Sequence, residues 1–398
     1  MKTLSVITIV ASLLVSVPLF AQQALFGGAQ TVSPQINADH SVTFRIEAAH
    51  ADTVQITGDF TPKVKMKTSY GEFETSGKAT MVKGSDGIWT YTSAPLGSDL
   101  YTYNVVVDGF KSTDPNNVYM IRDVASVFSI FIIPGGQGDL YSVRDVSHGT
   151  VARRWYNSPG NSMFRRLTIY TPPGYEASSE SYPVLYLLHG MGGDEEAWIN
   201  YGRTSQILDN LIAQGKAKPM IVVMTNGNVA QSAAPGESSL GFQKPGMMLP
   251  HTMDGQFEAT FPEVIKFVES NYRAKPDKSG RAIAGLSMGG YHSLHISRYY
   301  PNMFDYVGLF SAAILPNPNV QSKVYENIDQ TLKNQMDNDY KLYWIAMGKT
   351  DFLYQSGVDY RAKLDNMGMK YVYVESEGGH TWTNWRTYLS EFVPLLFR

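Results

Sequence analysis

"RAIAGLSMGGYHSL", residues 281–294, changes from a strand pattern to a helix pattern around a single serine. The apolar residues 282–284 predict the end of a buried strand, and the residues from 289 onward predict a helix. Between them, Gly285-Leu286-Ser287-Met288-Gly289 matches G-x-S-x-G, a motif whose glycines permit the sharp strand-to-helix turn that exposes a nucleophilic serine. This context favours Ser287 as a nucleophile over a serine that serves only in a turn.

Similar apolar runs on both sides of this stretch predict a largely parallel sheet that is buried on both faces. They alternate with helical patterns, which favours a doubly wound α/β domain with its site at the carboxyl ends of the strands. The other expected strands are residues 182–190, 218–227, 304–313, 341–348 and 370–376, and the expected helices are residues 205–216, 261–273, 293–301, 359–368 and 386–397.

The residues that precede this domain have a different sequence pattern. Residues 31–133 contain short β-branched and aromatic runs separated by Gly, Asp, Pro and Ser, a pattern that predicts an antiparallel β-sandwich. The stretch "IPGGQGDLYS", residues 133–142, is typical of a linker or domain edge. We therefore expect an all-β domain over residues 22–139 and the α/β domain over residues 140–398.

Composition limits the partners and the compartment. The chain has 398 residues, a net charge of −3 and no charge run, so nothing indicates nucleic acid as a partner. Residues 1–21 contain Lys2, a short apolar stretch and Ala21, and they predict a cleaved signal peptide. The chain has no cysteine, so neither disulfides nor a lipid-carrying cysteine is expected. We expect a secreted or periplasmic protein with no membrane attachment after cleavage.

A serine nucleophile needs a base, and a histidine usually supplies it. Where the motif forms a strand-to-helix turn, the order along the chain is serine, acid, histidine. His292 and His295 lie on the helix directly after Ser287, where they cannot reach back over its Oγ. His380 lies in a glycine-preceded loop after strand 370–376, so His380 is the expected base.

The acid that orients this histidine has several candidates between Ser287 and His380. Asp351 follows strand 341–348 directly and is the preferred candidate. Asp337 and Asp339 precede that strand and therefore lie at its amino end, opposite the expected site. The other carboxylates considered are Asp305, Asp359, Asp365, Glu375 and Glu377.

An oxyanion hole is the second device that acyl transfer needs. Its usual donors are two backbone N–H groups, one from the residue after the nucleophile and one from an early strand-to-helix loop. Met288 and Met191 are the expected donors, the latter from "LLHGMGGDEEAW", residues 187–198. In that stretch the consecutive carboxylates 194–196 do not face one point, so we expect a solvated helix start and no metal site or cofactor.

With these residues placed, the chain resembles the esterase D-like α/β-hydrolases and, within them, carbohydrate esterase family 1, the feruloyl and acetylxylan esterases. The resemblance rests on residues 185–198, 207–227, 282–290 ("AIAGLSMGG") and 377–386 ("EGGHTWTNWR"). Residues 42–60, 86–96 and 101–109 are similar to the family 48 carbohydrate-binding modules, which are immunoglobulin-like sandwiches.

The resemblance implies a secreted serine esterase that hydrolyses feruloyl esters on plant xylan or xylo-oligosaccharides through an acyl-enzyme. Ser287 would attack, His380 would transfer the proton and Asp351 would orient the imidazole. Acetylated xylan and catecholate siderophores are alternative substrates, and a carbohydrate-binding protein without activity is the alternative outside enzymology. The lysine-poor loops favour a neutral glycan over a siderophore.

Substrate contacts are expected from three aromatic residues. Trp198 and Trp382 flank the two catalytic loops and are expected to stack on an aromatic acid or a sugar, unless they serve only in packing. Phe242 lies in the long segment 227–255, which is of the kind that forms an active-site wall, and is expected to border the acyl pocket. In the N-terminal domain, Trp89 and Tyr103 alternate in strands, a pattern more typical of a core than of a sugar platform.

Overall fold

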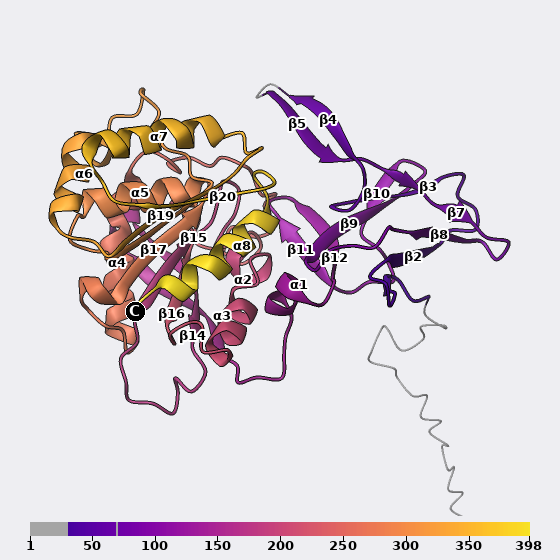
Figure 1. The fold of residues 1–398 in the computed structure, drawn as a ribbon, viewed down its shortest axis with the longest axis horizontal. Helices are drawn as coiled ribbons and strands as arrows, with labels where there is room; N and C mark the ends of the chain where they lie inside the picture. The colour runs from indigo at the N-terminus through magenta and orange to yellow at the C-terminus, as the bar shows by residue number, and fades with distance from the viewer. Residues whose placement is uncertain (1–30, 69–70) are drawn as a thin grey trace, which may run out of the picture.

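The computed structural model describes residues 31–68 and 71–398. The expected signal peptide, residues 1–21, lies outside the described residues. Two units lie side by side, an all-β unit and an α/β unit, and Figure 1 shows them with their elements labelled. In the described part of the chain, no helix is both long and apolar enough to cross a bilayer.

Two antiparallel sheets form the N-terminal unit. One has the order β1-β2-β8-β7, and the other has the order β11-β12-β9-β3-β6 with β10 paired to β9. Their strands are β1 (Gln35–Ile36), β2 (Val42–Glu47), β3 (Val54–Gly58), β6 (Ala79–Thr80), β7 (Val82–Lys83), β8 (Ile88–Thr92), β9 (Leu100–Val107), β10 (Phe110–Ser112), β11 (Met120–Asp123) and β12 (Ser126–Ile132).

The side chains between these two sheets make a separate apolar core. Phe44 stacks on Phe60 at 5.1 Å and meets Tyr103 edge-on at 4.8 Å. Trp89 and Tyr103 both belong to this core. Trp89 Nε1 donates a hydrogen bond to the backbone oxygen of Ala48, and the Tyr103 hydroxyl donates one to the carboxylate of Asp114. The alternation of these two residues therefore reflects packing.

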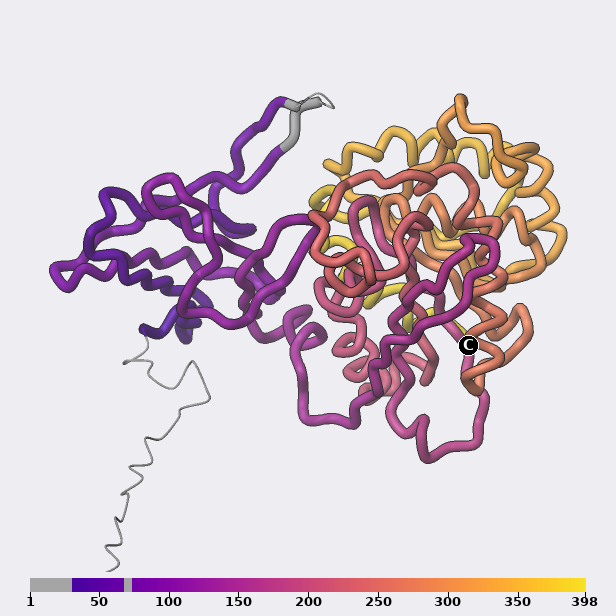
Figure 2. Tube along the Cα trace, turned by 180° about the vertical axis from the view of Figure 1, so that it is seen from behind, coloured from indigo at the N-terminus to yellow at the C-terminus, as the bar shows by residue number. Residues whose placement is uncertain are grey.

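A two-stranded hairpin extends from the sandwich. It consists of β4 (Lys63–Thr68) and β5 (Gly71–Ser76), which pair only with each other among the described strands. Figures 1 and 2 show it leaning from the sandwich toward the α/β unit.

The α/β unit is built on an eight-stranded sheet with the order β13-β14-β16-β15-β17-β18-β19-β20. The strands from β16 to β20 pair in parallel, whereas β13 and β14 are antiparallel additions at one edge. The predicted fold class, a doubly wound α/β sheet preceded by an all-β sandwich, is confirmed. The strands are β13 (Thr150–Ser158), β14 (Met163–Thr171), β15 (Val184–Leu188), β16 (Ile221–Thr225), β17 (Arg281–Leu286), β18 (Tyr306–Phe310), β19 (Leu342–Gly348) and β20 (Val372–Ser376).

Helices cover both faces of this sheet because successive strand residues point to opposite sides. In β15, Leu185 and Leu187 join the core under α2, α3 and α8, whereas Tyr186 joins the core under α4 to α7. The helices are α1 (Gly136–Tyr141), α2 (Ala197–Asn200), α3 (Thr204–Ala213), α4 (Gln256–Asn271), α5 (Met288–Tyr299), α6 (Ile328–Asp337), α7 (Tyr354–Met367) and α8 (Trp382–Phe392).

The two units share an apolar contact. Leu100, Ile121 and Ile130 of the sandwich belong to the same buried cluster as Trp382 and Trp385 of α8. The buried Arg386 on α8 reinforces this contact, because its Nη2 donates to Asp99 Oδ1 at 3.1 Å and to the backbone oxygen of Leu100 at 3.0 Å. The sandwich is thus packed against the helix that follows the His380 loop.

Candidate active site

Ser287 stands in the turn between β17 and α5, with φ 54° and ψ −114°. This is a strained conformation for a residue with a side chain, and such strain concentrates at functional sites. Glycines make the turn possible. A Cβ on Gly289 would lie 2.2 Å from the backbone oxygen of Leu188, and one on Gly285 would lie 2.4 Å from the backbone of Gly289. The glycines of the motif therefore allow α5 to approach the sheet closely.

The structure brings Ser287, His380 and Asp351 into one hydrogen-bonded chain. Ser287 Oγ lies 2.9 Å from His380 Nε2. On the other side of the ring, His380 Nδ1 lies 3.0 and 2.9 Å from the two carboxylate oxygens of Asp351. These distances fit a nucleophile, a base and an orienting acid.

Asp351 itself is held in place by the loop after β19. It is buried, and its Oδ1 accepts a hydrogen bond from the Leu353 backbone N–H at 2.9 Å. The alternative acid Asp339 lies at the amino end of β19, as the sequence predicts. His292 and His295 are fully buried in α5 and bond to Glu258 and to the backbone oxygen of Ile314, so neither takes part in this chain.

The expected oxyanion loop lies beside Ser287. Met191 lines the cavity that contains Ser287, and a Cβ on Gly190 would lie 3.3 Å from the Ser287 Cβ. Met288 is the first residue of α5, where a backbone N–H has no partner within the helix. Met191 thus borders the same cavity as Ser287, and Met288 directly follows the serine.

His189 anchors this loop, a role that no sequence pattern indicated. Its Nε2 accepts a hydrogen bond from the Gly227 N–H at 2.8 Å, and its Nδ1 donates to the Gly190 backbone oxygen at 2.7 Å. A nitrogen that accepts a hydrogen bond carries no proton, so the bond at Nε2 requires the neutral ring. Burial lowers the pKa of His189 from its ordinary value of 6.5 to about 4.

This pKa predicts a loss of stability in acid. Between pH 6.5 and about 4, the unfolded chain binds a proton at His189 that the folded chain does not, so the free energy of unfolding falls as the pH falls. At about 1.4 kcal/mol per pKa unit, this residue contributes about 3 kcal/mol to the fall. Urea unfolding of the wild type and of His189→Gln across this range measures it, and the variant should show the weaker pH dependence. Identical pH profiles would contradict the assignment.

The cavity at Ser287 has a volume of about 240 Å³ and mainly apolar walls. Of the residues expected to contact substrate, Trp382 lines it. Its wall also includes residues that no sequence pattern indicated, among them Val124, Met247, Phe352 and Trp385. Trp385 stands edge-on to the His380 ring at 5.0 Å.

Two expected contacts are corrected. Trp198 is 1% exposed, its Nε1 donates to the backbone oxygen of Leu188 at 2.8 Å, and its ring packs edge-on against Trp382, so it supports the wall from behind. Phe242 is 97% exposed and is not among the described residues that line the cavity. The long segment 227–255 does border the cavity, but through Met247.

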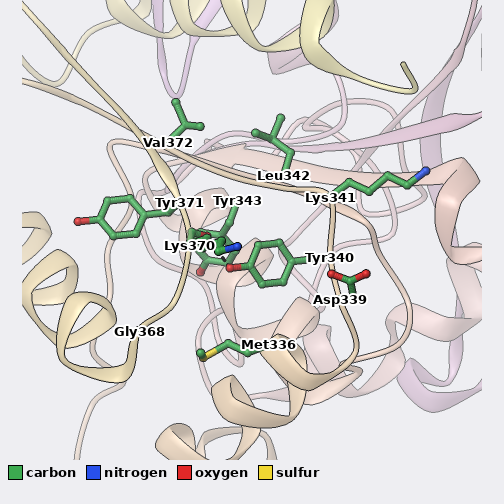
Figure 3. A pocket seen from close by; sticks show the side chains of 10 residues that line it. All are labelled: Met336, Asp339, Tyr340, Lys341, Leu342, Tyr343, Gly368, Lys370, Tyr371 and Val372. Atoms are coloured by element: carbon green, nitrogen blue, oxygen red, sulfur yellow. Dashed lines mark hydrogen bonds between the residues drawn. The ribbon is translucent and has the colours of Figure 1, made fainter.

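One further cavity adjoins the site, and another lies apart from it. One, of about 590 Å³, shares Phe352 and His380 with the first and is lined on its far side by Lys63, Lys65 and Glu74 of the β4–β5 hairpin. Figure 3 shows the other, of about 350 Å³, where Tyr340, Tyr371 and Val372 frame a space at the amino ends of β19 and β20. It lies at the opposite end of these strands from Asp351 and His380, so it is separate from the site.

The carboxylates 194–196 are not a solvated helix start, which corrects that expectation. Asp194, Glu195 and Glu196 are buried because arginines neutralise them. Arg166 Nε contacts Glu195 Oε1 at 2.7 Å, and Arg153 Nε contacts Glu196 Oε1 at 2.7 Å. Across residues 31–68 and 71–398, no three His, Cys, Asp or Glu side chains are grouped to hold a metal ion.

The fold is that of the α/β-hydrolases, and the family comparison places the chain among the esterases. The model of the family described as "Putative esterase" matches residues 160–396, which is more than half of the chain. The chain therefore belongs to this esterase family.

Two curated relatives carry named activities. The chain is 28% identical over 373 residues to an endo-1,4-beta-xylanase/feruloyl esterase of Xylanibacter ruminicola, which covers 92% of this chain and 46% of that protein. It is 26% identical over 243 residues to an acetyl esterase of Caldicellulosiruptor saccharolyticus, covering 54% of this chain and 83% of that protein. The chain thus spans about half the length of the Xylanibacter protein.

Two solved structures share the fold. A CE1 ferulic acid esterase from Anaeromyces mucronatus, in complex with ferulic acid, is 24% identical with a TM-score of 0.54, covering 64% of this chain and 93% of that chain. The enterobactin esterase from Shigella flexneri is 14% identical with a TM-score of 0.58, covering 89% of this chain and 92% of that chain. The second match includes most of the N-terminal unit as well.

Proposed function

We propose that the protein is a secreted serine esterase that hydrolyses feruloyl and related hydroxycinnamoyl esters on plant xylan through an acyl-enzyme. The observation that carries this proposal is the chain Ser287–His380–Asp351, which opens into a mainly apolar cavity of about 240 Å³. The hydrogen-bonded chain supports the reaction type, and the cavity supports the acyl group.

In the first half of the reaction, Ser287 Oγ attacks the ester carbonyl while His380 Nε2 takes the serine proton. Asp351 holds the Nδ1–H and stabilises the positive imidazolium that forms. The negative charge on the carbonyl oxygen falls between the N–H groups of Met191 and Met288. His380 then protonates the alcohol oxygen, the alcohol leaves, and the acyl group stays on Ser287.

In the second half, His380 takes a proton from a water molecule, and the hydroxide attacks the acyl-serine. The carboxylic acid leaves when His380 returns its proton to Ser287 Oγ. The reaction consumes one water and yields one acid and one alcohol, so the chain's own groups suffice for every proton transfer described.

The dimensions of the cavity favour a large acyl group. A water molecule takes up about 30 Å³ in the liquid, so a cavity of about 240 Å³ is far larger than the methyl group of an acetyl ester requires. The aromatic rings of Phe352, Trp382 and Trp385 in its wall suit the flat ring of a hydroxycinnamoyl group.

The cavity beside the hairpin suits the alcohol part of the ester. His380 must protonate the leaving oxygen, so the alcohol lies next to its ring, and His380 lines this second cavity too. The wall there includes polar side chains of Thr350, Thr381 and Glu74, which can hydrogen-bond to sugar hydroxyls. A polar sugar and an apolar acid would thus occupy different spaces.

The names of the relatives support the same substrate class, since the Xylanibacter protein is described as a xylanase/feruloyl esterase. The acetyl esterase relative favours an acetyl ester as the second candidate. A siderophore ester is less well supported, because the described residues that line the acyl cavity include no lysine or arginine.

Substrate comparison tests the proposal. Purified protein should release ferulate from methyl ferulate and from feruloylated xylo-oligosaccharides, with kcat/KM for methyl ferulate at least about tenfold above that for an acetylated xylo-oligosaccharide. A difference of this size needs about 1.4 kcal/mol of selective binding, which one hydrophobic pocket can supply. Activity on acetyl esters alone would overturn the feruloyl assignment, and activity on a catecholate lactone alone would favour the siderophore alternative.

Export is a separate part of the proposal and rests on residues 1–21. Expression with and without these residues, followed by fractionation and N-terminal sequencing, should give a product outside the cytoplasm that starts near Gln22. Full-length protein that stays in the cytoplasm would contradict export.

A further inference from the structure

The turn between β11 and β12 brings the sandwich into the active site. Only Val124 and Ala125 lie between β11, which ends at Asp123, and β12, which begins at Ser126, and Asp123 pairs with Ser126. We call residues 122–125, which include the last two residues of β11, the β11–β12 turn. Asp123 and Val124 line the same cavity as Ser287 and His380. The N-terminal unit therefore contributes part of the wall that faces the acyl group.

Val124 adopts a conformation that valine normally avoids. Its φ is 50°, at the first of two central residues in a tight hairpin, where glycine or asparagine is the usual choice. A β-branched residue rarely adopts this region, and such a residue persists only where its surroundings hold it. In this conformation Val124 presents a branched apolar side chain to the cavity, whereas glycine would leave a gap in the cavity wall.

The turn is fixed to the oxyanion loop. A Cβ on Gly192 would lie 2.8 Å from Val124 Cγ2, so the valine side chain packs on the backbone next to Met191. Arg122 Nη2 contacts Asp194 Oδ2 at 2.5 Å, and the Asp194 side chain is only 2% exposed. The same guanidinium donates through Nη1 to the Val124 backbone oxygen at 3.1 Å, which ties the turn and the loop together.

The turn also contacts the segment that follows His380. Trp382 Nε1 donates to Asp123 Oδ1 at 3.4 Å. Since Arg122 meets the oxyanion loop and Asp123 meets Trp382, one short turn touches the neighbours of both the oxyanion site and the catalytic base. A substrate acyl group that lies between these two loops would contact Val124.

We propose that Val124 is a specificity-determining residue that limits the size of the acyl group, and that Arg122 is a positioning residue for the oxyanion loop. This inference rests on the proposed esterase function and assigns the acyl selectivity of that site in part to the sandwich. A larger side chain at residue 124 should exclude bulky acyl groups and still admit acetyl.

Val124→Phe tests the size limit on a series of 4-nitrophenyl esters from acetate to octanoate, together with methyl ferulate. We expect kcat/KM for octanoate and for methyl ferulate to fall about tenfold or more relative to acetate, as a filled pocket predicts. Val118→Phe is the matched control, because Val118 is 81% exposed on the same sandwich and does not line the cavity. Its acyl preference should equal that of the wild type.

Val124→Gly is the complementary variant, because glycine relieves the positive φ and removes the wall. It should fold at least as stably as the wild type and shift the preference toward longer acyl chains. An unchanged acyl preference in both variants would overturn the role of Val124, as would a uniform loss on all esters in Val124→Phe together with no shift in Val124→Gly.

Arg122→Gln tests positioning. It should lower kcat on acetate and on longer esters alike by about tenfold, with KM changed less than about threefold, because misplaced oxyanion donors act on the transition state. Arg122→Lys, which keeps a charge for Asp194, should restore part of kcat. Equal kcat in the wild type and Arg122→Gln would contradict this role. Wild-type protein that cleaves aryl esters but not methyl ferulate would overturn the feruloyl assignment alone, since the aryl series still tests both residues.

Discussion

Replacing Ser287 by alanine is expected to lower kcat for methyl ferulate by about 10⁵-fold, because the variant has no oxygen that can accept the acyl group. The Ser287 Oγ is the only atom of this side chain beyond Cβ, and its distance of 2.9 Å to His380 Nε2 fits proton transfer. Alanine can keep the same backbone conformation at φ 54°, so the free energy of unfolding should change by less than about 1 kcal/mol. Steady-state kinetics and urea unfolding measure the two effects.

Ser179→Ala is a suitable control for this variant, since Ser179 is exposed in a surface loop of the α/β unit. It should leave both kcat and stability at the wild-type values. Activity of Ser287→Ala within tenfold of the wild type would contradict the assignment of the nucleophile.

Replacing Asp351 by asparagine is expected to lower kcat by about 10³- to 10⁴-fold, with little change in KM. Asparagine keeps the shape of the side chain, and its oxygen can still accept the bond from the Leu353 N–H. Its NH₂ group, however, would face His380 Nδ1 as a donor and favour the ring form that carries the proton on Nε2. That form cannot accept the proton of Ser287.

Asp359→Asn is the matched control, because Asp359 is an exposed carboxylate on α7 that bonds to Gln355 at 2.8 Å. Its kcat should equal that of the wild type. NMR of the imidazole N–H protons would report the change of ring form in Asp351→Asn directly. A kcat within a factor of ten of the wild type would show that another group orients His380.

The sequence predicted the parts of the fold that depend on local patterns. The buried strands are recognisable in the sequence as apolar runs. The glycines around Ser287 are recognisable too, because close packing of α5 on the sheet leaves no room for a side chain at Gly285 or Gly289. The order of the strand ends was sufficient to select His380 and Asp351 for one site, which the structure places within hydrogen-bond distance.

Other parts depend on contacts between distant segments and could not be read from a local pattern. Most residues of the edge strand β13 are exposed or half-buried, so the strand shows no buried run. The carboxylates 194–196 have the pattern of a solvated helix start, and their burial depends on contacts with distant segments, above all with the arginines of β13, β14 and the β11–β12 turn. Helix α6 also went unpredicted, because its residues are largely polar.

The residues that line the substrate cavity could not be predicted from a local pattern either. Trp198 is expected to contact substrate because it flanks a catalytic loop, but it is buried under Trp382. Phe242 is expected there because it lies in the long segment 227–255, but it faces solvent. The sequence gives no indication that Val124 lines the cavity, since a valine followed by an alanine resembles an ordinary strand residue. Its position depends on how the sandwich docks on α8 and on the oxyanion loop.

The most direct test of the central claim is to trap the acyl-enzyme. Protein mixed with excess methyl ferulate and quenched in acid during the first turnovers should contain a species heavier by one feruloyl group. Peptide mass spectrometry should locate that group on Ser287, and Ser287→Ala should show none. A feruloyl group on a different residue, or continued ferulate release by Ser287→Ala, would contradict the account.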